Sequence, residues 1–166
     1  MKIIAAIIGM GIGQKHFEAI EGYKNSKVKI ICEKDPKKIN KLKKKYPRKL
    51  VVSDENKIFL DKSINLVSIA SYDNFHFKQI VKSISSNKNI IVEKPMCLKL
   101  TELVKIKKLL KKKPNLKMIS NLVLRANDLF LNFKKQIKRK KTIYIEADYM
   151  WGRKYKLSGW RNKIKE

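Results

Sequence analysis

The sequence predicts an α/β fold: a doubly wound parallel sheet, followed by a fragment of a second α/β domain. Short β-branched segments alternate with amphipathic helical segments, which is the rhythm of consecutive βαβ units. A cluster of glycines directly after the first apolar segment indicates a tight strand-to-helix turn. The rhythm changes after residue 121. We therefore expect one domain over residues 1–121 and the beginning of another over residues 122–166.

The expected strands are short and rich in isoleucine and valine. The first, Lys2–Ile8, consists almost entirely of β-branched residues and alanine, as a strand buried on both faces should. Helical segments separate the strands, so we expect right-handed crossovers and parallel pairing. The other five expected strands are Lys27–Cys32, Leu50–Val52, Asn65–Ala70, Asn89–Val92 and Leu116–Ile119.

The expected helices carry apolar residues at helical spacing and several have start signals. Asp35 and Pro36 form the clearest signal, an N-cap followed by proline at the first helical position. The expected helices are His16–Tyr23, Asp35–Tyr46, Asp54–Leu60, Asn74–Ser85 and Thr101–Lys112. In the fourth of them, periodicity predicts that Phe75, Ile80, Val81 and Ile84 face inward.

The region after residue 121 contains two further expected elements. Asp128–Ile137 has the pattern of a helix, and Thr142–Tyr149 alternates like a strand. A lone strand has open edges, so we expect this one to offer an oligomer contact.

Composition excludes several classes of protein. No apolar run is long enough to cross a bilayer. The apolar N-terminus is broken early by glycines and lacks a cleavage site, so we interpret it as a buried strand in a cytoplasmic protein. Two histidines and two isolated cysteines, Cys32 and Cys97, predict reduced core thiols and no metal site.

The net charge is high, at +27 from 41 Lys and Arg against 14 Asp and Glu. Such a balance raises the question of nucleic-acid binding. Most of the excess is lysine spread from Lys24 to Lys165, and arginines and aromatics do not cluster as a base-reading surface would require. We therefore expect no specific nucleic-acid partner, and no membrane partner.

The glycine cluster Gly9-Met10-Gly11-Ile12-Gly13 is the strongest sign of function. The first glycine permits a tight turn, and the second lets a pyrophosphate approach the backbone at the N-terminus of the next helix. The cluster departs from GxGxxG because Gly13 comes one residue early. We expect Gly9, Gly11, Ile12 and Gly13 to bind a dinucleotide; the alternative is a turn needed only for packing.

An acidic residue follows the second expected strand. Glu33 stands about 20 residues after Gly11, where a carboxylate binds the adenine ribose of a dinucleotide. Asp35 is the alternative, but it has a competing role as a helix cap. A carboxylate at position 33 favours NAD over NADP because it would repel a 2′-phosphate, although Lys34 next to it weakens this preference.

Two further loops follow strands of the expected sheet, where open α/β sheets bind ligands. Ser71, Asn74 and His76 come after the fourth strand and are expected on the nicotinamide side; alternatively, His76 packs or caps locally. Glu93 and Lys94, before Pro95, come after the fifth strand. Proline biases Lys94 to an extended conformation, from which it can orient or protonate a substrate oxygen while hydride leaves the adjacent carbon.

The segments IIGMGIGQKH, ICEKDP, SIASYDNFH and IVEKP resemble the Gfo/Idh/MocA family of NAD(P)-dependent oxidoreductases. The resemblance covers residues 1–121 and continues more weakly through SNLVLRAND and YIEADYMWGRKYKLSGWR. It implies a Rossmann domain that binds NAD or NADP through the glycine turn, Glu33, the loop of His76, and Glu93. It also implies that Lys94 contacts both cofactor and a sugar, sugar derivative or cyclitol.

The same resemblance raises the question of completeness. Family enzymes place an acid/base histidine in the C-terminal domain, whereas no histidine follows His76 here. We therefore expect an oxidoreductase that is incomplete as it stands. The alternatives are a nonenzymatic dinucleotide-binding remnant or sensor and, third, a basic nucleic-acid-binding module.

Overall fold

The computed structural model describes residues 2–138, 142–148 and 150. The chain forms two compact units, Met1–Leu124 and Arg125–Glu166. The strands of the first unit are β1 (Ile3–Ile8), β2 (Ser26–Cys32), β3 (Leu50–Val52), β4 (Leu66–Ile69), β5 (Asn89–Val92) and β6 (Met118–Ser120). Its helices are α1 (Gly13–Gly22), α2 (Pro36–Lys45), α3 (Asn56–Leu60), α4 (Asp73–Ser85) and α5 (Leu100–Lys111). A 3-10 helix, η1 (Val123–Ala126), and α6 (Asp128–Ile137) follow.

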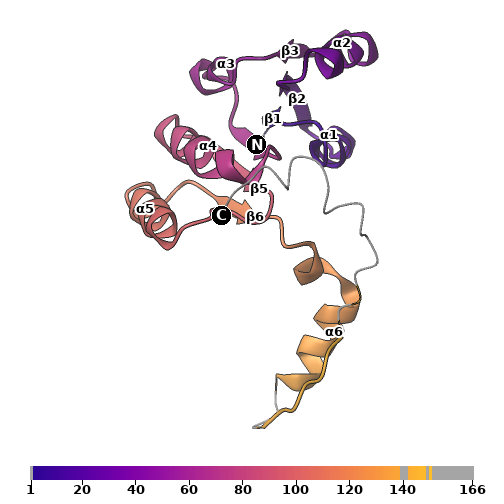
Figure 1. Ribbon diagram of the computed structural model, residues 1–166, viewed down its shortest axis with the longest axis vertical. Coiled ribbons are helices and arrows are strands. Elements are labelled where there is room, and N and C mark those ends of the chain that lie inside the picture. Colours follow the sequence, from indigo (N-terminus) through magenta and orange to yellow (C-terminus); the bar gives the residue numbers. More distant parts are fainter. Residues whose placement is uncertain (1, 139–141, 149, 151–166) are drawn as a thin grey trace. The chain divides into compact units, whose positions relative to one another are not determined.

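The six strands form one sheet in the order β3-β2-β1-β4-β5-β6 (Figure 1). Every neighbouring pair is parallel. The strand order runs outward in both directions from β1 and β4, so the topological switch point lies between these two strands. The expected doubly wound parallel sheet is therefore confirmed.

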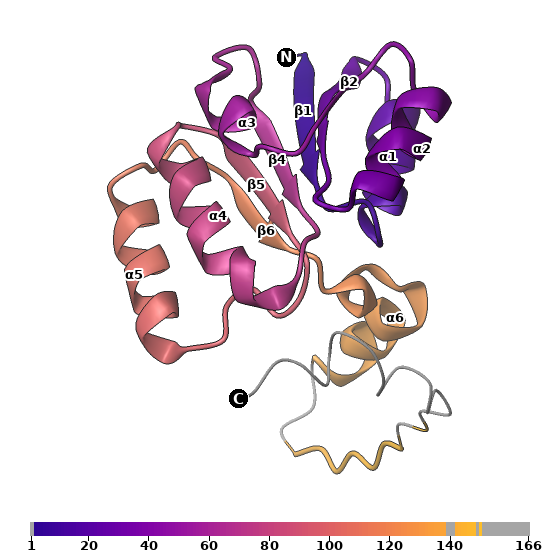
Figure 2. The same cartoon turned by 45° about the horizontal axis from the view of Figure 1, so that its top comes forward.

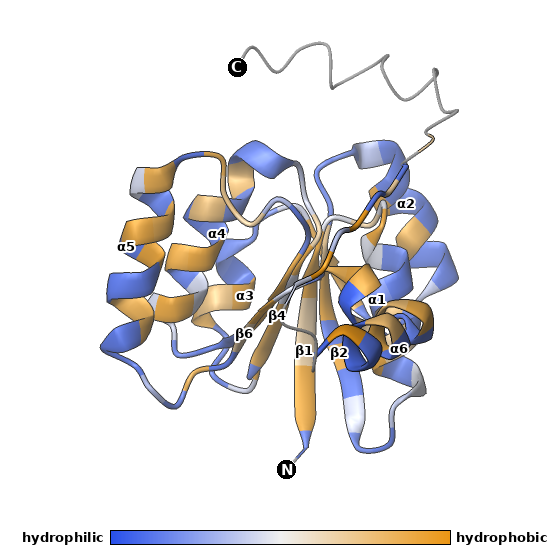
Figure 3. Ribbon diagram, turned by 90° about the horizontal axis from the view of Figure 1, so that it is seen from below, coloured by the Kyte–Doolittle hydropathy of each residue, from blue (hydrophilic) through white to orange (hydrophobic). Residues whose placement is uncertain are grey.

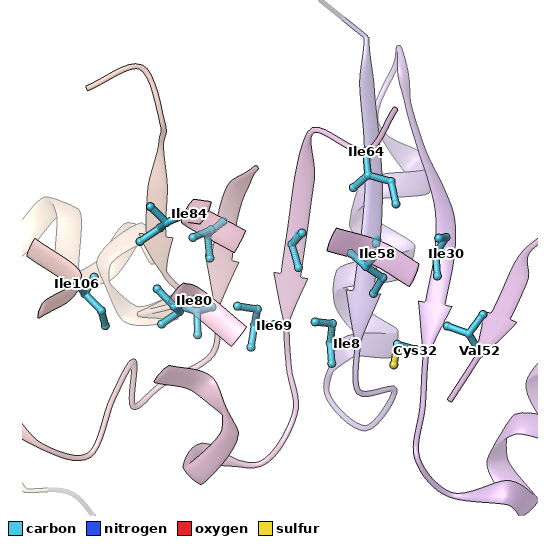
Figure 4. Packing of buried hydrophobic residues seen from close by; sticks show 14 residues of the cluster. Ile8, Ile30, Cys32, Val52, Ile58, Ile64, Ile69, Ile80, Ile84 and Ile106 are labelled. Atoms are coloured by element: carbon cyan, nitrogen blue, oxygen red, sulfur yellow. The ribbon is translucent and has the colours of Figure 1, made fainter. Parts of the chain in front are cut away.

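Helices cover both faces of the sheet, with α1 and α2 on one side and α3, α4 and α5 on the other (Figure 2). On the second side, isoleucines from alternate strand positions pack against Ile58 of α3, Ile80 and Ile84 of α4 and Ile106 of α5 (Figure 4). On the first side, the core joins Phe17 of α1 to strand residues of β1 and β2. The strands are mostly hydrophobic, whereas the helices contain both hydrophobic and hydrophilic residues (Figure 3). This is the pattern expected of a sheet that helices cover on both faces.

Two helices differ from expectation in detail. The α1 helix begins at Gly13 rather than at His16, because a residue without Cβ can start the helix close against β1. The inward orientation predicted for Phe75 is wrong, since 47% of this residue is exposed. The buried positions of α4 are instead His76, Gln79, Ile80, Ser83 and Ile84. Polar residues on the buried face concealed the true period.

The second unit contains α6, none of whose residues is buried. The strand predicted over Thr142–Tyr149 is wrong for residues 142–148, which have no strand structure, and Tyr149 lies outside the described residues. A strand needs a hydrogen-bonded neighbour, and no described strand lies in this unit. Within the described part of the chain, no helix has the length and apolar character needed to span a membrane.

A buried lysine stabilises the amino edge of the sheet. Only 2% of Lys88, just before β5, is exposed. Its Nζ donates to the carbonyl oxygens of Asp61 (2.7 Å) and Ile64 (3.0 Å) in the turn before β4. Burial lowers the pKa of Lys88 because it disfavours the charged ammonium group. The two hydrogen bonds offset the cost of removing this group from water.

We expect Lys88→Met to lower the free energy of unfolding by about 1–3 kcal/mol, because two carbonyl groups lose their donor. Urea unfolding of the wild-type chain and the variant measures this difference. An unchanged midpoint would show that the turn does not depend on Lys88.

The side chain of Asp61 in the same turn bonds to Lys29, with Oδ2 and Nζ 2.6 Å apart. Hydrogen bonds from Lys29 and Ser63 lower the pKa of Asp61 to about 2. The folded pKa is below that of the unfolded chain, so the carboxylate stabilises the fold above about pH 4 and this contribution is lost towards pH 2.

We expect Asp61→Asn to destabilise the chain at pH 7 by about 1 kcal/mol, a modest amount because Lys29 is partly exposed to solvent. The difference from the wild type should shrink as the pH falls from 4 to 2. Urea titrations at several pH values test this, and a difference independent of pH would contradict it.

Candidate functional site

The carboxyl ends of the parallel strands bring the predicted site residues to one edge of the sheet. The glycine turn follows β1, Glu33 follows β2, Ser71 comes shortly after β4, and Glu93 and Lys94 follow β5. Open α/β sheets bind their ligands outside this edge, at the switch point. Here the switch point lies between β1 and β4, beside the N-terminus of α1.

Gly9 forms the tight turn after β1. Its φ angle is +86°, and a Cβ at this position would lie 2.5 Å from the carbonyl oxygen of Ala70. Its amide donates to the carbonyl oxygen of Cys32 at 2.8 Å. Only glycine combines this backbone conformation with so close an approach to the end of β4.

Gly11 and Gly13 have different surroundings. A Cβ on Gly13 would meet the side chains of Ile7 at 3.0 Å and Ala70 at 3.2 Å, so this glycine allows α1 to pack closely on the sheet. A Cβ on Gly11 would meet no atom within 4 Å. Packing therefore accounts for Gly9 and Gly13 in spite of the shortened spacing, but it does not account for Gly11.

The N-terminus of α1 is suited to an anion. Its N-cap residue, Ile12, makes no side-chain capping hydrogen bond, and the first turn contains no acidic residue. The amides of Gln14 and Lys15 donate to the carbonyl oxygens of Gly11 (3.4 Å) and Ile12 (2.9 Å), and this end of α1 carries the positive end of the helix dipole. Together with the open space at Gly11, these features fit a pyrophosphate group.

Glu33 is buried beside the glycine turn. Its Oε2 accepts a hydrogen bond from the Met10 amide (3.1 Å), and its Oε1 accepts from the amides of Lys34 (2.8 Å) and Asp35 (3.3 Å). The side chain of Asp35 instead caps α2 through the amide of Lys37 (2.8 Å). Of the two acidic candidates, Glu33 thus contacts the glycine turn and Asp35 is the predicted helix cap.

The loop after β4 is tied to the loop after β5 by His76, whose ring is fully buried. Its Nδ1 lies 2.7 Å from the carbonyl oxygen of Pro95, and its Nε2 lies 3.1 Å from that of Ser71. His76 therefore packs inside the domain and contacts both loops, as the packing alternative predicts. The hydroxyl of Ser71 donates to Gln79 (2.6 Å), while Asn74 is exposed.

Glu93 and Lys94 differ sharply in environment. Lys94 is exposed, whereas Glu93 is buried. One carboxylate oxygen of Glu93, Oε1, lies 3.0 Å from His16 Nε2 and accepts a hydrogen bond from Asn121 Nδ2 at 2.5 Å. His16 Nδ1 lies 2.7 Å from Ser68 Oγ.

Sequence reasoning missed His16, Ser68 and Asn121. Two weak signals were present. His16 follows Gly13 by one helical turn, and Asn121 follows β6 as Glu93 follows β5. Neither signal reveals that the side chains meet.

Thiol and metal chemistry receive no support at this edge. Burial raises the pKa of Cys32 to about 11, and that of Cys97 is also raised by burial. Both thiols are therefore protonated at neutral pH and are poor nucleophiles. The described residues contain no group of three His, Cys, Asp or Glu side chains that could hold a metal ion.

Comparison with known proteins identifies similar oxidoreductases. YdgJ, an uncharacterized oxidoreductase of Escherichia coli, is 28% identical over 102 residues, which are 60% of this chain and 29% of YdgJ. The structure of scyllo-inositol dehydrogenase from Lactobacillus casei, with NAD(H) and scyllo-inositol bound, superposes with a TM-score of 0.77 at 23% identity. The superposition covers 84% of this chain and 42% of the dehydrogenase chain. For myo-inositol 2-dehydrogenase from Lactobacillus plantarum the TM-score is 0.76 at 22% identity, with coverages of 83% and 41%.

At these identities the solved structures establish the fold, and the chain spans less than half the length of each relative. The sequence profile of the Gfo/Idh/MocA oxidoreductases, described as having an NAD-binding Rossmann fold, matches residues 3–121. This match includes the glycine turn, Glu33, and the loop of Glu93 and Lys94. The chain therefore belongs to the Gfo/Idh/MocA family of oxidoreductases with an NAD-binding Rossmann fold.

Proposed function

We propose that residues 1–121 form a domain that binds NAD(H) at the carboxyl edge of the sheet and serves hydride transfer to or from a small polyhydroxylated substrate. The observation that carries the proposal is the open space at Gly11 beside the uncapped N-terminus of α1. Packing does not require glycine at this position, whereas a closely approaching pyrophosphate does.

In this proposal the residues at the ends of β1 and β2 would hold the adenosine half of the cofactor. The glycine turn, with Gly9, Gly11, Ile12 and Gly13, holds the pyrophosphate. Glu33 binds the adenine ribose. Its carboxylate already accepts three backbone hydrogen bonds, but each of its oxygens can accept more than one bond, so it can also accept from a ribose hydroxyl. Its negative charge favours NAD over NADP.

The residues after β4 and β5 would hold the nicotinamide half. Ser71, Asn74, His76 and Glu93 form or support that side of the site. NAD supplies the hydride acceptor when it is bound. Lys94 is the proposed catalytic residue: from its exposed position it orients the substrate oxygen and exchanges a proton with it while hydride is transferred at the adjacent carbon.

The substrate class is inferred from relatives, because the pocket of an oxidoreductase needs more than this domain. The solved neighbours include dehydrogenases of scyllo-inositol and myo-inositol. A sugar, sugar derivative or cyclitol is therefore the proposed substrate, with residues 122–166 as the beginning of the substrate domain. A cytoplasmic location and an oligomer contact in residues 122–166 remain predictions.

Dinucleotide binding without turnover is the second candidate function. It requires only the glycine turn and Glu33, both of which lie within residues 3–121 that match the family. Cofactor binding is common to both candidates and is tested first.

We expect Gly11→Ala to weaken NADH binding at least about tenfold while changing the free energy of unfolding by no more than about 0.5 kcal/mol. The added methyl group meets no protein atom but occupies the space assigned to the pyrophosphate. NADH fluorescence titration and urea unfolding measure the two quantities.

Gly9→Ala is the matched control. It should lower the free energy of unfolding by more than about 1 kcal/mol, because it forces an L side chain into a positive φ angle against Ala70. If Gly11→Ala bound NADH as tightly as the wild type, the pyrophosphate would not lie at the glycine turn.

We expect the wild-type chain to bind NADH more tightly than NADPH, and Glu33→Gln to reduce this preference several-fold because it removes the charge that repels a 2′-phosphate. Parallel titrations with both cofactors at physiological salt test this. Equal preference in the variant and the wild type would remove Glu33 from the ribose site.

A further inference from the structure

Four polar side chains from four separate elements meet at the carboxyl edge of the sheet. They are His16 of α1, Ser68 of β4, Glu93 after β5 and Asn121 after β6, and we refer to them as the His16 network. The side chains of His16 and Glu93 are only 9% and 12% exposed. The network thus reaches from the helix that follows the glycine turn across the switch point to the loop of Lys94.

The hydrogen-bonding roles within the network follow from its chemistry. An ionised carboxylate can only accept, so the 3.0 Å contact with Glu93 Oε1 requires a proton on His16 Nε2. A neutral ring then accepts the Ser68 hydroxyl at Nδ1, over 2.7 Å. The Asn121 amide donates to the same Glu93 oxygen. His16 and Asn121 therefore hold the same carboxylate oxygen from neighbouring positions, with Asn121 Nδ2 3.3 Å from His16 Nε2.

The backbone around Glu93 is held as firmly as its side chain. The Glu93 amide donates to the Ile69 carbonyl oxygen at 2.9 Å, and the Asn121 amide donates to the Val92 carbonyl oxygen at 2.7 Å. Lys94 is the next residue along the chain. Together with these backbone bonds, the network holds the residue that directly precedes Lys94.

Stability alone does not explain such a network. Replacing buried polar or ionic groups by well-packed apolar ones is often neutral or stabilising, and the core on both faces of this sheet is built from isoleucine and valine. A buried polar network whose groups are all hydrogen-bonded instead makes the structure rigid and specifies one arrangement of its side chains. Here that geometry links the first turns of α1 to the loop of Lys94.

We propose that His16 is a positioning residue: through Glu93 it couples the cofactor-binding end of α1 to the orientation of Lys94. This inference rests on the proposed function, since it concerns the same site. Its consequence is that the contribution of Lys94 to NADH binding depends on His16, although the two side chains are not in contact.

A double-mutant cycle tests this coupling. NADH affinities are measured for the wild type, His16→Leu, Lys94→Ala and the double variant. If His16 acts through Lys94, the affinity loss in the double variant should be at least about fivefold smaller than the product of the two single losses. Independent, multiplying losses would overturn the proposal.

Two variants separate positioning from general destabilisation. His16→Gln retains an amide donor that can reach Glu93, and should recover much of the NADH affinity lost in His16→Leu. Lys88→Met is the matched control, because it removes a buried polar group at the opposite edge of the sheet. Its effect should multiply independently with that of Lys94→Ala. Coupling of equal size in this control would show that the effect is only loss of stability.

A spectroscopic measurement covers the case in which His16→Leu does not fold. The chain has only two histidines, so the imidazole nitrogen signals are few and His16→Gln assigns them. We expect protonated Nε2 at His16, a change in its signals in Glu93→Gln, and a further change when NADH is added to the wild type. An Nε2 without a proton, or no response to bound NADH, would overturn the coupling.

The NADH titration of the wild-type chain distinguishes a failure of the proposed function from a failure of the positioning role of His16. If the wild-type chain does not bind NADH, the proposed function fails and this inference fails with it. If the wild type binds NADH but the cycle shows no coupling, only the positioning role of His16 fails.

Discussion

The close approach of Gly9 to the backbone of Ala70 is the constraint on which the carboxyl edge of this sheet depends. The amide of Gly9 bonds to the end of β2, and the amide of Ala70 bonds to the Ile8 carbonyl oxygen at the end of β1. The ends of β1, β2 and β4 are thereby joined around one residue that can carry no side chain. Because this junction lies at the switch point, it also sets where α1 begins and where a ligand can approach the sheet.

Buried polar groups join segments of different strands at both edges of the sheet. At the amino edge, Lys88, just before β5, donates to carbonyl oxygens in the turn before β4. At the carboxyl edge, Glu33, His76 and Glu93 each connect segments that belong to different strands. The residues expected to touch a cofactor therefore also hold the loops in place. Order is concentrated where ligand binding needs a fixed geometry.

The sequence predicted the sheet well because apolar residues dominate most strands, throughout in β1 and from Ile30 to Cys32 in β2, and burial on both faces produces that pattern. The glycine turn and Glu33 were found because their contacts are set by local spacing. His16 was not, because its partner Glu93 is 77 residues away and only the folded sheet brings them together. Phe75 was misplaced because polar His76 and Gln79 occupy the buried face of α4. The predicted strand is wrong for residues 142–148 because an alternating pattern does not itself provide a hydrogen-bonded neighbour.

The central position of β1 has a consequence for how the chain is made. This strand precedes the other five strands of the sheet in the chain, yet one of its two neighbours is β4. Asn65, just before β4, bonds to Ile4 through both its amide and its side chain, across 61 residues of chain. Long loops must close before such contacts form. During translation, the backbone groups along one edge of β1 therefore stay unpaired until β4 has left the ribosome.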